Sequence, residues 1–525
     1  MYPPVTAADV AALLEARFRE GFLTLRDLPS PYSFKDMKKA ARRIALAIRR
    51  GERIAVVGDY DVDGTVATAV MLECFEAAGC DVQWIVPNRF EDGYGLSVSV
   101  INKLDNPHLI VTVDNGIAAV EAANVCKERG IELIITDHHL LPPQVPEAYA
   151  VIDPKQPDCP FPYDEVCGAQ IAWYLAAALK EELCLSLDLK AMLDLIAVAT
   201  VADMMPLRHI NRAMVIAGLQ QMAQSRRPAM RAFLKYLDKA MPTAEDIGFV
   251  LAPLINSAGR MEDASLAVEF LRARNIYDAQ TLLGKLVATN EARKSVEAKL
   301  TKEALAQAKM QEGVIVAHGE GWHEGVVGIV AARVARACKR PALILSRNEK
   351  GVLKGSGRSF HGCDLFTLLS SAREVLDRFG GHKAAVGLSL SDDRLEMLRR
   401  YLDDAYDPDM LQSKDEEVLG ALPFSEISFD LLRLLERFEP YGTGNPKPKF
   451  YTAPLQVVAS ERIGKEKNHV RYMLEHNGIR FEALHFKTET MLPNKAQAEA
   501  IYTLAQNRFR GTCKIELYIE EITPL

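Results

Sequence analysis

The sequence predicts an α/β protein in which a doubly wound parallel sheet comes first, a second α/β domain follows, and a small β-barrel comes last. Three observations predict this order. Strand-like and helix-like runs alternate from residue 53 to about residue 155, and the same alternation begins again at residue 313. Beyond a Pro- and Gly-rich segment at 439–450, the remaining runs are short and β-like. A chain of 525 residues is too long for one core, so about two to four domains are expected.

The first sheet is predicted by five apolar runs with helical runs between them. The strand-like runs read "RIAVVG", "DVQWIVPNR", "HLIVTVDNG", "IELIITDHH" and "AYAVIDPK". The helical runs include "TVATAVMLECFEAAG" and "AAVEAANVCKERG", and the helical run "FKDMKKAARRIALAIRR" precedes the first strand. Such alternation favours a parallel sheet with helices on both of its faces.

The rest of the chain divides into three further parts. Residues 168–312 read as mostly helical and end in "NEARKSVEAKLTKEALAQAK", which is typical of a long connecting helix. The second α/β domain combines strand-like "GVIVAHG", "PALILS", "VLKGSGRS" and "AAVGLSLS" with helical "GVVGIVAARVARA" and "DLFTLLSSAREVLDRF". The last runs, "LQVVASERIG", "HVRYMLEH", "IRFEALHF" and "CKIELYIEEI", favour a small OB-fold barrel of about five strands. We expect domains at 1–210 (with a short N-terminal helical region), 211–312, 313–438 and 439–525.

The composition narrows the class of protein. Hydrophobic residues make up 49% and charged residues 25% of the chain, and no run of about 18 apolar residues predicts a membrane span. The N-terminal residues lack a signal-peptide pattern. The nine cysteines form no C-x-x-C pair, which argues against zinc ribbons and disulfides and favours a reducing cytoplasm. A net charge of −7 argues against a protein that coats nucleic acid non-specifically, so any polyanion site must be a local groove.

Three aspartates follow the first predicted strand in "GDYDVDG": Asp59, Asp61 and Asp63. An EF-hand calcium loop also begins with this spacing, but it needs a bidentate Glu at its twelfth position. That position here is Val70, and the segment in front reads as a strand where an EF-hand has a helix. An EF-hand calcium site is therefore excluded, and two interpretations remain: a catalytic metal site, or a turn with solvated acids.

More acids and two imidazoles follow the other predicted strands. Asp114 comes after "LIVTV", and Asp137, His138 and His139 come after "LIIT". A single Asp at such a place is more often a helix N-cap, but the carboxyl ends of parallel strands share one rim, where ligands bind. Carboxylates gathered there oppose folding unless cations neutralise them. Carboxylates with one or two imidazoles suit Mn²⁺, with Mg²⁺ as the other choice, and two such ions can promote phosphoryl transfer.

These segments resemble a known family. "GDYDVDG", "VTVDNG", "TDHH" and "ATVADMMP" resemble the successive motifs of the DHH phosphoesterase superfamily. "PNRFEDGYGL", "INSAGRM", "EGVVGIVAARVA", "GSGRS", "GGHKAAVG" and "EPYGTGNPKP" are similar to segments of its single-strand-specific 5′→3′ DNA exonucleases, in which a DHHA1 domain and an OB-fold follow the DHH domain. The similarity runs in order from about residue 34 to the end. Two features depart from the family's sequence pattern. Position 62 is Val where Ala is commoner, and the stretch before Asp59 is short. Val57 replaces the His of pyrophosphatase-type relatives.

The resemblance implies roles for the acids and imidazoles. Asp61 and Asp63 would bind one metal ion each, Asp59 would lie beside them as a ligand or a supporting group, and Asp114 would bridge both ions. His138, Asp63 and Asp203 would complete the second site; nothing but the resemblance selects Asp203. His139 would face the scissile phosphate while Asp137 orients an imidazole.

It also implies substrate contacts away from the metal ions. Arg89, Ser356 and Arg358 would hold a 5′-terminal phosphate, and Asn256, Arg260 and His382 would contact the substrate. Several of them have a plainer interpretation: "GSGRS" as a turn, His382 as a structural histidine, and Arg89 and Arg358 as surface arginines in ion pairs. Residues 451–525 hold ten Lys and Arg against nine Asp and Glu, so nucleic-acid binding by the barrel rests on the resemblance. Tyr472, Phe481 and Phe486 are base-stacking candidates or core residues.

The reaction that the resemblance implies is hydrolysis, with two Mn²⁺ or Mg²⁺ ions, of the bond between the first and second nucleotides of single-stranded DNA, which releases 5′-mononucleotides in DNA repair and recombination. Single-strand-binding protein and a helicase are the implied partners. Two alternatives stay open: a phosphodiesterase for short oligoribonucleotides or cyclic dinucleotides, and a non-catalytic replication scaffold. A nucleotide-dependent oxidoreductase is excluded because no G-x-G-x-x-G follows the first strand.

Overall fold

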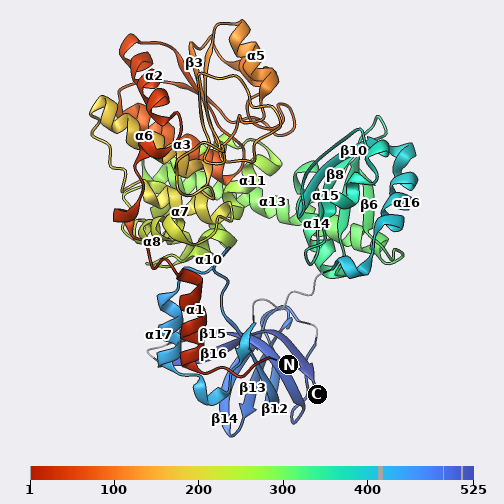
Figure 1. Ribbon diagram of the computed structural model, residues 1–525. Helices are drawn as coiled ribbons and strands as arrows, with labels where there is room; N and C mark the ends of the chain where they lie inside the picture. Colours follow the sequence, from red (N-terminus) through yellow and green to blue (C-terminus); the bar gives the residue numbers. More distant parts are fainter. Residues whose placement is uncertain (1, 412–417, 489, 510–511) are drawn as a thin grey trace. The chain divides into compact units, whose positions relative to one another are not determined.

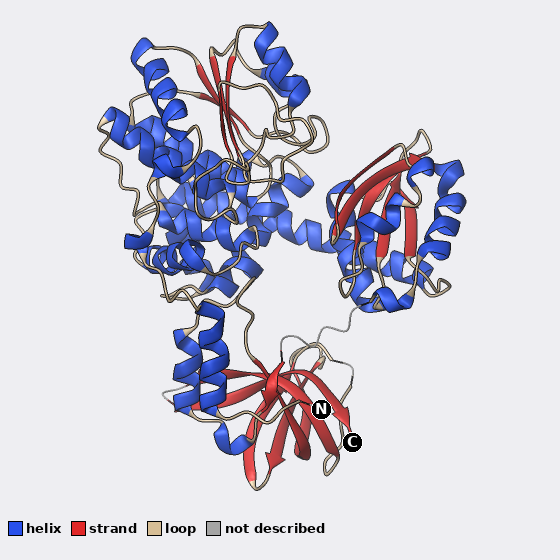
Figure 2. Ribbon diagram, viewed as in Figure 1, coloured by secondary structure: helices blue, strands red, loops and turns tan. Residues whose placement is uncertain are grey.

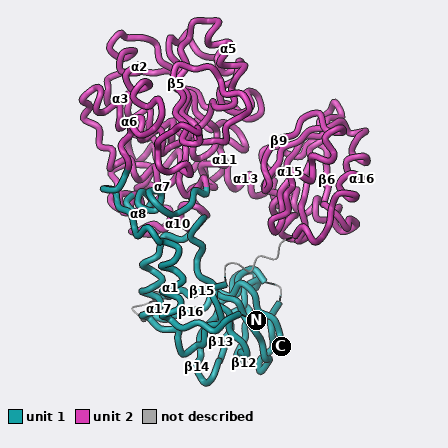
Figure 3. The backbone as a smooth tube through the Cα atoms, in the orientation of Figure 1, with its two compact units in different colours: residues 1–28, 204–217, 415–525 teal, residues 29–203, 218–414 magenta. Residues whose placement is uncertain are grey.

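The computed structural model describes residues 2–411, 418–488, 490–509 and 512–525. It divides into two compact units, which Figure 3 colours separately. One, which we call the α/β unit, comprises residues 29–203 and 218–414; the other, the barrel unit, comprises residues 1–28, 204–217 and 415–525. Among the described residues, no helix has both the length and the apolar character needed to cross a bilayer.

The α/β unit begins with an all-parallel sheet of order β2-β1-β3-β4-β5. Its strands are β1 (Ile54–Val57), β2 (Gln83–Ile85), β3 (Leu109–Val113), β4 (Glu132–Thr136) and β5 (Ala150–Ile152). Every residue of β1 and β3 is buried, which explains why these strands read as continuous apolar runs. The strand order reverses between β1 and β3. The carboxyl ends at such a point are where open α/β sheets bind ligands.

Helices cover both faces of this sheet, as the alternation predicted (Figures 1 and 2). On one face, α2 (Met37–Arg50), α3 (Val62–Ala77) and α6 (Gly168–Leu183) pack together. On the other, α4 (Val98–Lys103) and α5 (Val120–Glu128) bury their apolar residues against those of the strands. The doubly wound arrangement is therefore confirmed.

A helical region follows the first sheet. Its elements are α7 (Leu193–Ala202), α8 (His209–Ala223), α9 (Pro228–Leu237), α10 (Ala244–Asp246), the π-helical turn η4 (Ile247–Leu251), α11 (Ala252–Met261), α12 (Ser265–Leu271) and α13 (Ile276–Ala308). The expected long connecting helix is α13, which runs for 33 residues from its cap at Asn275. It packs on both α11 and α14 (Glu324–Cys338), and so joins the helical region to the second α/β domain.

The second sheet has the order β6-β7-β8-β10-β9. Its elements are β6 (Ile315–Glu320), β7 (Ala342–Arg347), β8 (Val352–Arg358), β9 (Arg378–His382) and β10 (Ala385–Ser391), with α15 (Leu365–Ser370) and α16 (Leu395–Ala405) beside them. β6 and β7 are parallel and the other pairs antiparallel. The helix expected from "DLFTLLSSAREVLDRF" ends at Ser370, and its last residues enter β9, which the sequence did not predict. Gly380 and Gly381 break the helical pattern there, and β10 supplies the partner strand.

The barrel unit is built on β11 (Val418–Ala421), β12 (Lys449–Ile463), β13 (His469–His476), β14 (Ile479–His485), β15 (Gln497–Phe509) and β16 (Thr512–Pro524). The order is β11-β12-β13-β14-β16-β15, and an additional pairing of β12 with β15 closes five of the strands into a barrel. This confirms the small barrel expected after the Pro- and Gly-rich segment. Short 3₁₀ turns complete the two units: η1 (Ala16–Phe18), η2 (Leu25–Asp27), η3 (Pro31–Ser33), η5 (Arg373–Val375), η6 (Asp392–Arg394), η7 (Pro408–Met410) and η8 (Phe424–Glu426).

The N-terminal residues belong to the barrel unit, which differs from the expected domain boundaries of 1–210 and 439–525. Val10 and Leu14 of α1 (Ala7–Glu15) share one apolar core with Leu431 of α17 (Phe429–Arg437) and with the barrel strands. The N–H of Ala7 also donates to Glu426 Oε2 at 2.9 Å. A short amphipathic helix shows which of its faces is apolar but not which distant segment that face will cover.

Candidate active site

The turn after β1 gathers the first three aspartates. Asp61 is the N-cap of α3, and its Oδ1 accepts a hydrogen bond from the N–H of Gly64 at 2.9 Å. A Cβ on Gly64 would lie 2.6 Å from backbone and side-chain atoms of Asp59. The glycine that ends "DYDVDG" is therefore needed because the chain folds back onto Asp59 at that point. Asp63 lies in the first turn of α3.

The N-terminus of α6 packs between Asp63 and the acid that follows β3. Asp63 accepts hydrogen bonds from the N–H groups of Gly168 and Ala169, at 2.5 and 2.8 Å. A Cβ on Gly168 would lie 2.4 Å from Oδ1 of Asp114. Asp114 itself has a left-handed backbone, with φ of 64°, a conformation that is enriched at functional sites. Unpaired helix N–H groups stabilise negative charge, so α6 lets two buried acids approach each other.

The segment after β4 orients its two imidazoles through one carboxylate. Oδ1 of Asp137 accepts from Nδ1 of His139 at 2.7 Å and from the N–H of His138 at 2.8 Å. Its Oδ2 accepts from the N–H of Ile117 at 2.8 Å. These bonds outweigh burial and hold the pKa of Asp137 below its usual value. Burial disfavours the charged form of His139, but Asp137 reverses that effect and raises the pKa of His139 to about 9.

The predicted acids and His138 come together in two groups. Ligand atoms of Asp59, Asp61 and Asp114 all lie within 4.8 Å of one another, and so do those of Asp63, His138 and Asp203. Asp203 is the C-cap residue of α7. Nε2 of His138 lies 3.1 Å from Asp114, 3.6 Å from Asp63 and 3.7 Å from Asp203. A further combination, Asp114 with His138 and His139, meets the same distance.

These groups fit divalent cations. Burial first, and neighbouring carboxylates second, raise the pKa of Asp59 and of Asp114 well above the usual value, and raise that of Asp203 to about 8. One buried oxygen on each of these three residues has no hydrogen-bond partner among the described residues. Unpaired buried acceptors that repel one another are stabilised by a cation. Five carboxylates and an imidazole suit Mn²⁺ or Mg²⁺ rather than a metal that selects thiolates.

Arginines gather on one side of the acids. The guanidinium of Arg89 lies 4.1 Å from the centre of the Tyr60 ring, and its charge acts on Asp59 and Asp61. Burial, followed by the charges of Arg89, Arg293 and Arg358, lowers the pKa of Arg260 to about 10. The sequence-predicted Arg89 and Arg358 therefore each lie close enough to Arg260 to repel its charge.

The second α/β domain contributes Ser356 and Arg358 from β8. Nη1 of Arg358 donates to Ser356 Oγ at 2.6 Å and to the carbonyl of Gly357 at 2.8 Å. Within the described chain, neither Arg89 nor Arg358 has a carboxylate at ion-pair distance, so the alternative of surface ion pairs does not hold. Arg260 donates to the carbonyl of Gly325 at 3.2 Å, and a Cβ on Gly325 would lie 1.9 Å from the carbonyl oxygen of Arg260. The backbones of α11 and α14 thus touch beside these arginines.

The two other predicted substrate contacts lie on α11 and at the end of β9. Asn256 is half-buried on α11, four residues before Arg260 and so on the same helix face. His382 is exposed at the end of β9, where its Nδ1 accepts from the N–H of Ala384 at 3.3 Å. Of the stacking candidates, Tyr472 is only 1% exposed and Phe481 packs on the barrel core, whereas Phe486 is 47% exposed.

Sequence reasoning missed several residues of this site. The hydroxyl of Tyr94 lies 3.3 Å from both ring nitrogens of His139. Asn115 donates from Nδ2 to the carbonyls of Val57 and Val113, which ties β1 to β3. Asp153 is fully buried, and burial raises its pKa to about 7. Asp153 follows β5, so the strand-end rule that selected Asp114 would also have found it.

Comparisons with known proteins agree with this architecture. Family models match the DHH family N-terminal domain over residues 53–200, the DHHA1 domain over 311–407 and the RecJ OB domain over 420–521. The chain is 35% identical to the single-stranded-DNA-specific exonuclease RecJ of Dickeya dadantii, over 93% of this chain and 90% of that protein. It is also 35% identical to the protein of the same name from Bacillus subtilis, over 94% of this chain but only 64% of that longer protein.

Solved structures extend the similarity to the fold. The crystal structure of RecJ from Thermus thermophilus in complex with Mn²⁺ superposes with a TM-score of 0.83 at 28% identity, covering 99% of this chain and 79% of that one. The same protein with Mg²⁺ superposes with a TM-score of 0.77 at 28% identity, over 99% and 78%. The matches cover the three domains in order and nearly the whole chain. This chain therefore belongs to the RecJ family.

Proposed function

We propose that this protein is a metal-dependent exonuclease specific for single-stranded DNA, which degrades its substrate from the 5′ end and releases 5′-mononucleotides. The observation that carries the proposal is the pair of adjoining donor groups, Asp59–Asp61–Asp114 and Asp63–His138–Asp203. They lie at the point where the strand order of the parallel sheet reverses, in a chain with the domain order of RecJ.

Each group would hold one Mn²⁺ or Mg²⁺ ion, with Asp114 close enough to His138 to serve both. Two such ions stabilise the attacking and the leaving oxygens in phosphodiester hydrolysis. Asp137 favours the charged form of His139, and the ring would donate a hydrogen bond to a phosphate oxygen. Tyr94 packs on that ring and limits its movement. These residues supply orientation and charge, which are the main contributions in phosphoryl transfer.

The arginines support the direction of degradation. A 5′-terminal phosphate carries more charge than an internal one, and guanidinium groups bind such oxygens strongly. Arg89 and Arg358 have no carboxylate partner in the described chain, and Arg260 lies half-buried beside them at a cost in repulsion. An anion between them would remove that cost. We assign the 5′ phosphate to Arg89, Ser356 and Arg358, with Asn256, Arg260 and His382 as further substrate contacts.

The proposed substrate also suggests partners and a compartment. An enzyme that accepts only single strands needs unwound DNA, so a helicase and a single-strand-binding protein are the partners we propose, with DNA repair and recombination as the setting. The nine cysteines are all free, which supports a reducing compartment such as the cytoplasm.

A substrate panel tests the proposal. The full chain with Mn²⁺ is given 5′-phosphorylated single-stranded DNA, duplex DNA, short RNA and a cyclic dinucleotide, with the strands labelled at either end. We expect mononucleotides from the 5′ end of single-stranded DNA and little reaction with duplex, and Asp114→Ala should be inactive throughout. Strong preference for the cyclic dinucleotide or the RNA would favour the small-substrate phosphodiesterase instead, and binding without cleavage would favour a scaffold.

A further inference from the structure

Two of the helices that carry acids of the candidate metal site run antiparallel. α3 begins at the site, with Asp63 in its first turn, and α7 ends there, at Asp203. The two helices pack against each other. Consequently the last turns of α3 face the first turn of α7 at the opposite end of the pair, where Glu73 and Asp194 lie. From these residues to the acids of the site is about 15 Å along each helix, at 1.5 Å per residue.

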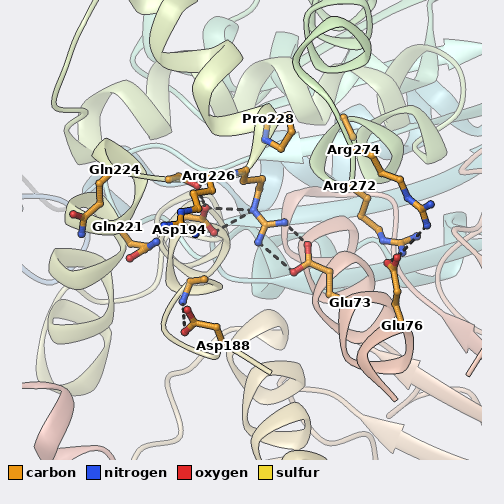
Figure 4. Close-up of a pocket in the computed structure, with 14 residues that line it drawn as sticks. Glu73, Glu76, Asp188, Asp194, Gln221, Gln224, Arg226, Pro228, Arg272 and Arg274 are labelled. Carbon is orange, nitrogen blue, oxygen red and sulfur yellow. Dashed lines mark hydrogen bonds and ion pairs between the residues drawn. The ribbon is translucent and has the colours of Figure 1, made fainter. Parts of the chain in front are cut away.

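Arg227 joins the two helices at that far end by contacting Glu73 and Asp194, both of which are labelled in Figure 4. Its Nη1 and Nη2 contact the two carboxylate oxygens of Glu73 on α3, and its Nε lies 3.3 Å from both oxygens of Asp194 on α7. Ser225 completes the arrangement, because its hydroxyl donates to Asp194 at 2.7 Å and its oxygen accepts from the N–H of Arg227 at 3.0 Å. Arg227 immediately precedes α9, so a third segment of the chain supplies this link.

The link sets the axial alignment of α3 and α7, which the apolar packing of the two helices defines less strictly. Contacts between apolar side chains are non-directional, and they bring α3 and α7 together without strictly setting their axial alignment. A bidentate guanidinium–carboxylate pair has a definite geometry. Buried ion pairs often contribute little net stability, and setting register is their best-attested use. Arg227 has 12% of its side chain exposed and Asp194 has 1%, so solvent screens the pair weakly.

We propose that Arg227 is a positioning residue, which holds α3 and α7 in the axial alignment that brings Asp63 and Asp203 to one metal ion. The inference rests on the proposed function, in that the Asp63–His138–Asp203 group binds an ion. It also predicts that the two metal ions respond differently to loss of the link. The Asp59–Asp61–Asp114 group contains no residue of α7, so loss of the link should weaken one of the two ions and spare the other.

A cavity of about 830 Å³ opens beside the link. Its lining includes Arg227, Glu73 and Asp194 together with the polar side chains of Gln221, Gln224 and Arg226 (Figure 4). Water can therefore solvate Glu73 and the carboxylate of Asp194 when the guanidinium is removed. For this reason we expect substitutions at Arg227 to fold.

The test is a titration of the full-length protein with Mn²⁺, followed by electron paramagnetic resonance of the free ion. Wild type should bind two ions. In Arg227→Gln one of them should bind about tenfold more weakly while the other keeps its affinity. Arg227→Lys should recover part of the lost affinity. Glu73→Gln leaves Arg227 paired with Asp194 and should weaken the same ion as Arg227→Gln does. It serves in place of Arg227→Gln if that variant fails to fold.

The matched control is Arg272, whose partner Glu76 lies one turn beyond Glu73 on α3. Arg272 pairs with Glu76 at 2.9 Å and lines the same cavity. Among the described residues it forms no hydrogen bond or ion pair with α7, so Arg272→Gln should leave both affinities unchanged. Equal weakening of both ions, or a lowered melting temperature with both affinities kept, would overturn the positioning role. If wild type degrades single-stranded DNA and binds two ions while Arg227→Gln does the same, only this inference fails. A wild type that binds no Mn²⁺ would overturn the proposed function and this inference with it.

Discussion

Nδ1 of His139 donates a hydrogen bond to Oδ1 of Asp137 over 2.7 Å, and the two residues belong to the same short segment after β4. The same carboxylate accepts from the backbone N–H groups of His138 and His139, at 2.8 and 3.2 Å. Asp137 is 1% exposed and His139 about half exposed. A buried carboxylate thus fixes the ring and the charge of an accessible imidazole, which is the arrangement expected of a group that meets a substrate anion.

Asp137→Asn tests this relationship. The substitution keeps the size of the side chain but removes the charge that raises the pKa of His139, so the ring should lose its proton at lower pH. If charged His139 is the active form, activity falls as pH rises through the pKa of about 9, and in the variant this fall should begin at a lower pH. We expect a loss of about ten- to a hundredfold in rate near neutral pH, as for other residues that orient an active group.

The measurement is a single-turnover rate against pH at saturating Mn²⁺. His139→Ala is the reference variant, because it should abolish the alkaline limb altogether. An Asp137→Asn profile with the limb of wild type would show that Asp137 does not set the charge of His139.

Asp114→Asn should separate metal binding from folding. Asn tolerates the left-handed backbone at this position, and it replaces a carboxyl whose ionisation is opposed by burial and by Asp63, Asp61 and Asp59. The metal-free variant should therefore melt at a higher temperature than metal-free wild type, yet gain little stability from Mn²⁺ and show no exonuclease activity. Thermal unfolding with chelator and with Mn²⁺ measures both effects. A variant that melts lower without metal and still gains as much from Mn²⁺ as wild type would contradict the assignment.

The raised pKa of Asp203 predicts how stability depends on pH. The folded-state pKa is about 8 and that of an unfolded Asp is about 3.9, so the folded protein favours the protonated form. The contribution of Asp203 to stability is complete below about pH 4 and is lost as pH rises through 8. In chelator, wild type should lose stability relative to Asp203→Asn between pH 5 and 8. Melting temperatures of the two proteins across this range give the difference, and a difference independent of pH would refute the shift.

Gly168→Ala should damage the metal site through one methyl group. The added Cβ would meet the side chain of Asp114 at 2.4 Å, and the neighbouring backbone is held by hydrogen bonds to Asp63. We expect weaker Mn²⁺ binding and a severe loss of activity.

Gly284→Ala is the matched control, since Gly284 lies on α13 with nothing within 4 Å of its added Cβ. It should stabilise the helix by about 0.5–1 kcal/mol and leave Mn²⁺ binding unchanged. Equal Mn²⁺ affinities for the two variants would count against the close packing of α6 on Asp114.

Arg358→Ala tests the anchoring of the 5′ end. Loss of a charge-assisted hydrogen bond costs about 1.5–3 kcal/mol, or about ten- to a hundredfold in affinity. Binding of 5′-phosphorylated strands should weaken by that factor and the advantage over 5′-hydroxyl strands should shrink, whereas the rate on saturating substrate should fall much less. Arg394→Ala, which removes a half-buried arginine paired with Asp377 in the same domain, should change neither. Full retention of the 5′-phosphate preference, or equal digestion from 3′ ends, would disprove the anchoring model.

Local periodicity was enough to predict the two sheets, the long helix and the barrel. β1 and β3 are buried along their whole length, so their apolar runs indicated strands, and topology then brought Asp59 and Asp114 to the same rim. His138 and His139 followed from the same rule. Asp203 did not, because it ends a helix and reaches the site only through the packing of α7 on α3. No local pattern contains that information, and only the family resemblance selected the residue.

Other features were beyond sequence reasoning for similar causes. β9 exists because β10 lies beside it, while its own residues read as the end of a helix. Tyr94 contacts His139 from a loop whose path depends on Asn115, which accepts the N–H of Leu96 at 3.0 Å. Arg227 lies in a stretch that reads as an ordinary basic turn, and its partners are 154 and 33 residues away.

Residues 1–28 and 415–525 of the barrel unit lie before and after the α/β unit in the sequence. Ala7 and its partner Glu426 are 419 residues apart. At about 5–20 residues per second of synthesis, the ribosome needs about 20–80 s to add the partner after the first segment has emerged. During that time Val10, Leu14 and Phe18 have no core to enter, and they are available to chaperones or to another nascent chain. The apolar residues of α1 therefore stay without the rest of their core until after the acids and imidazoles of the candidate site have been synthesised.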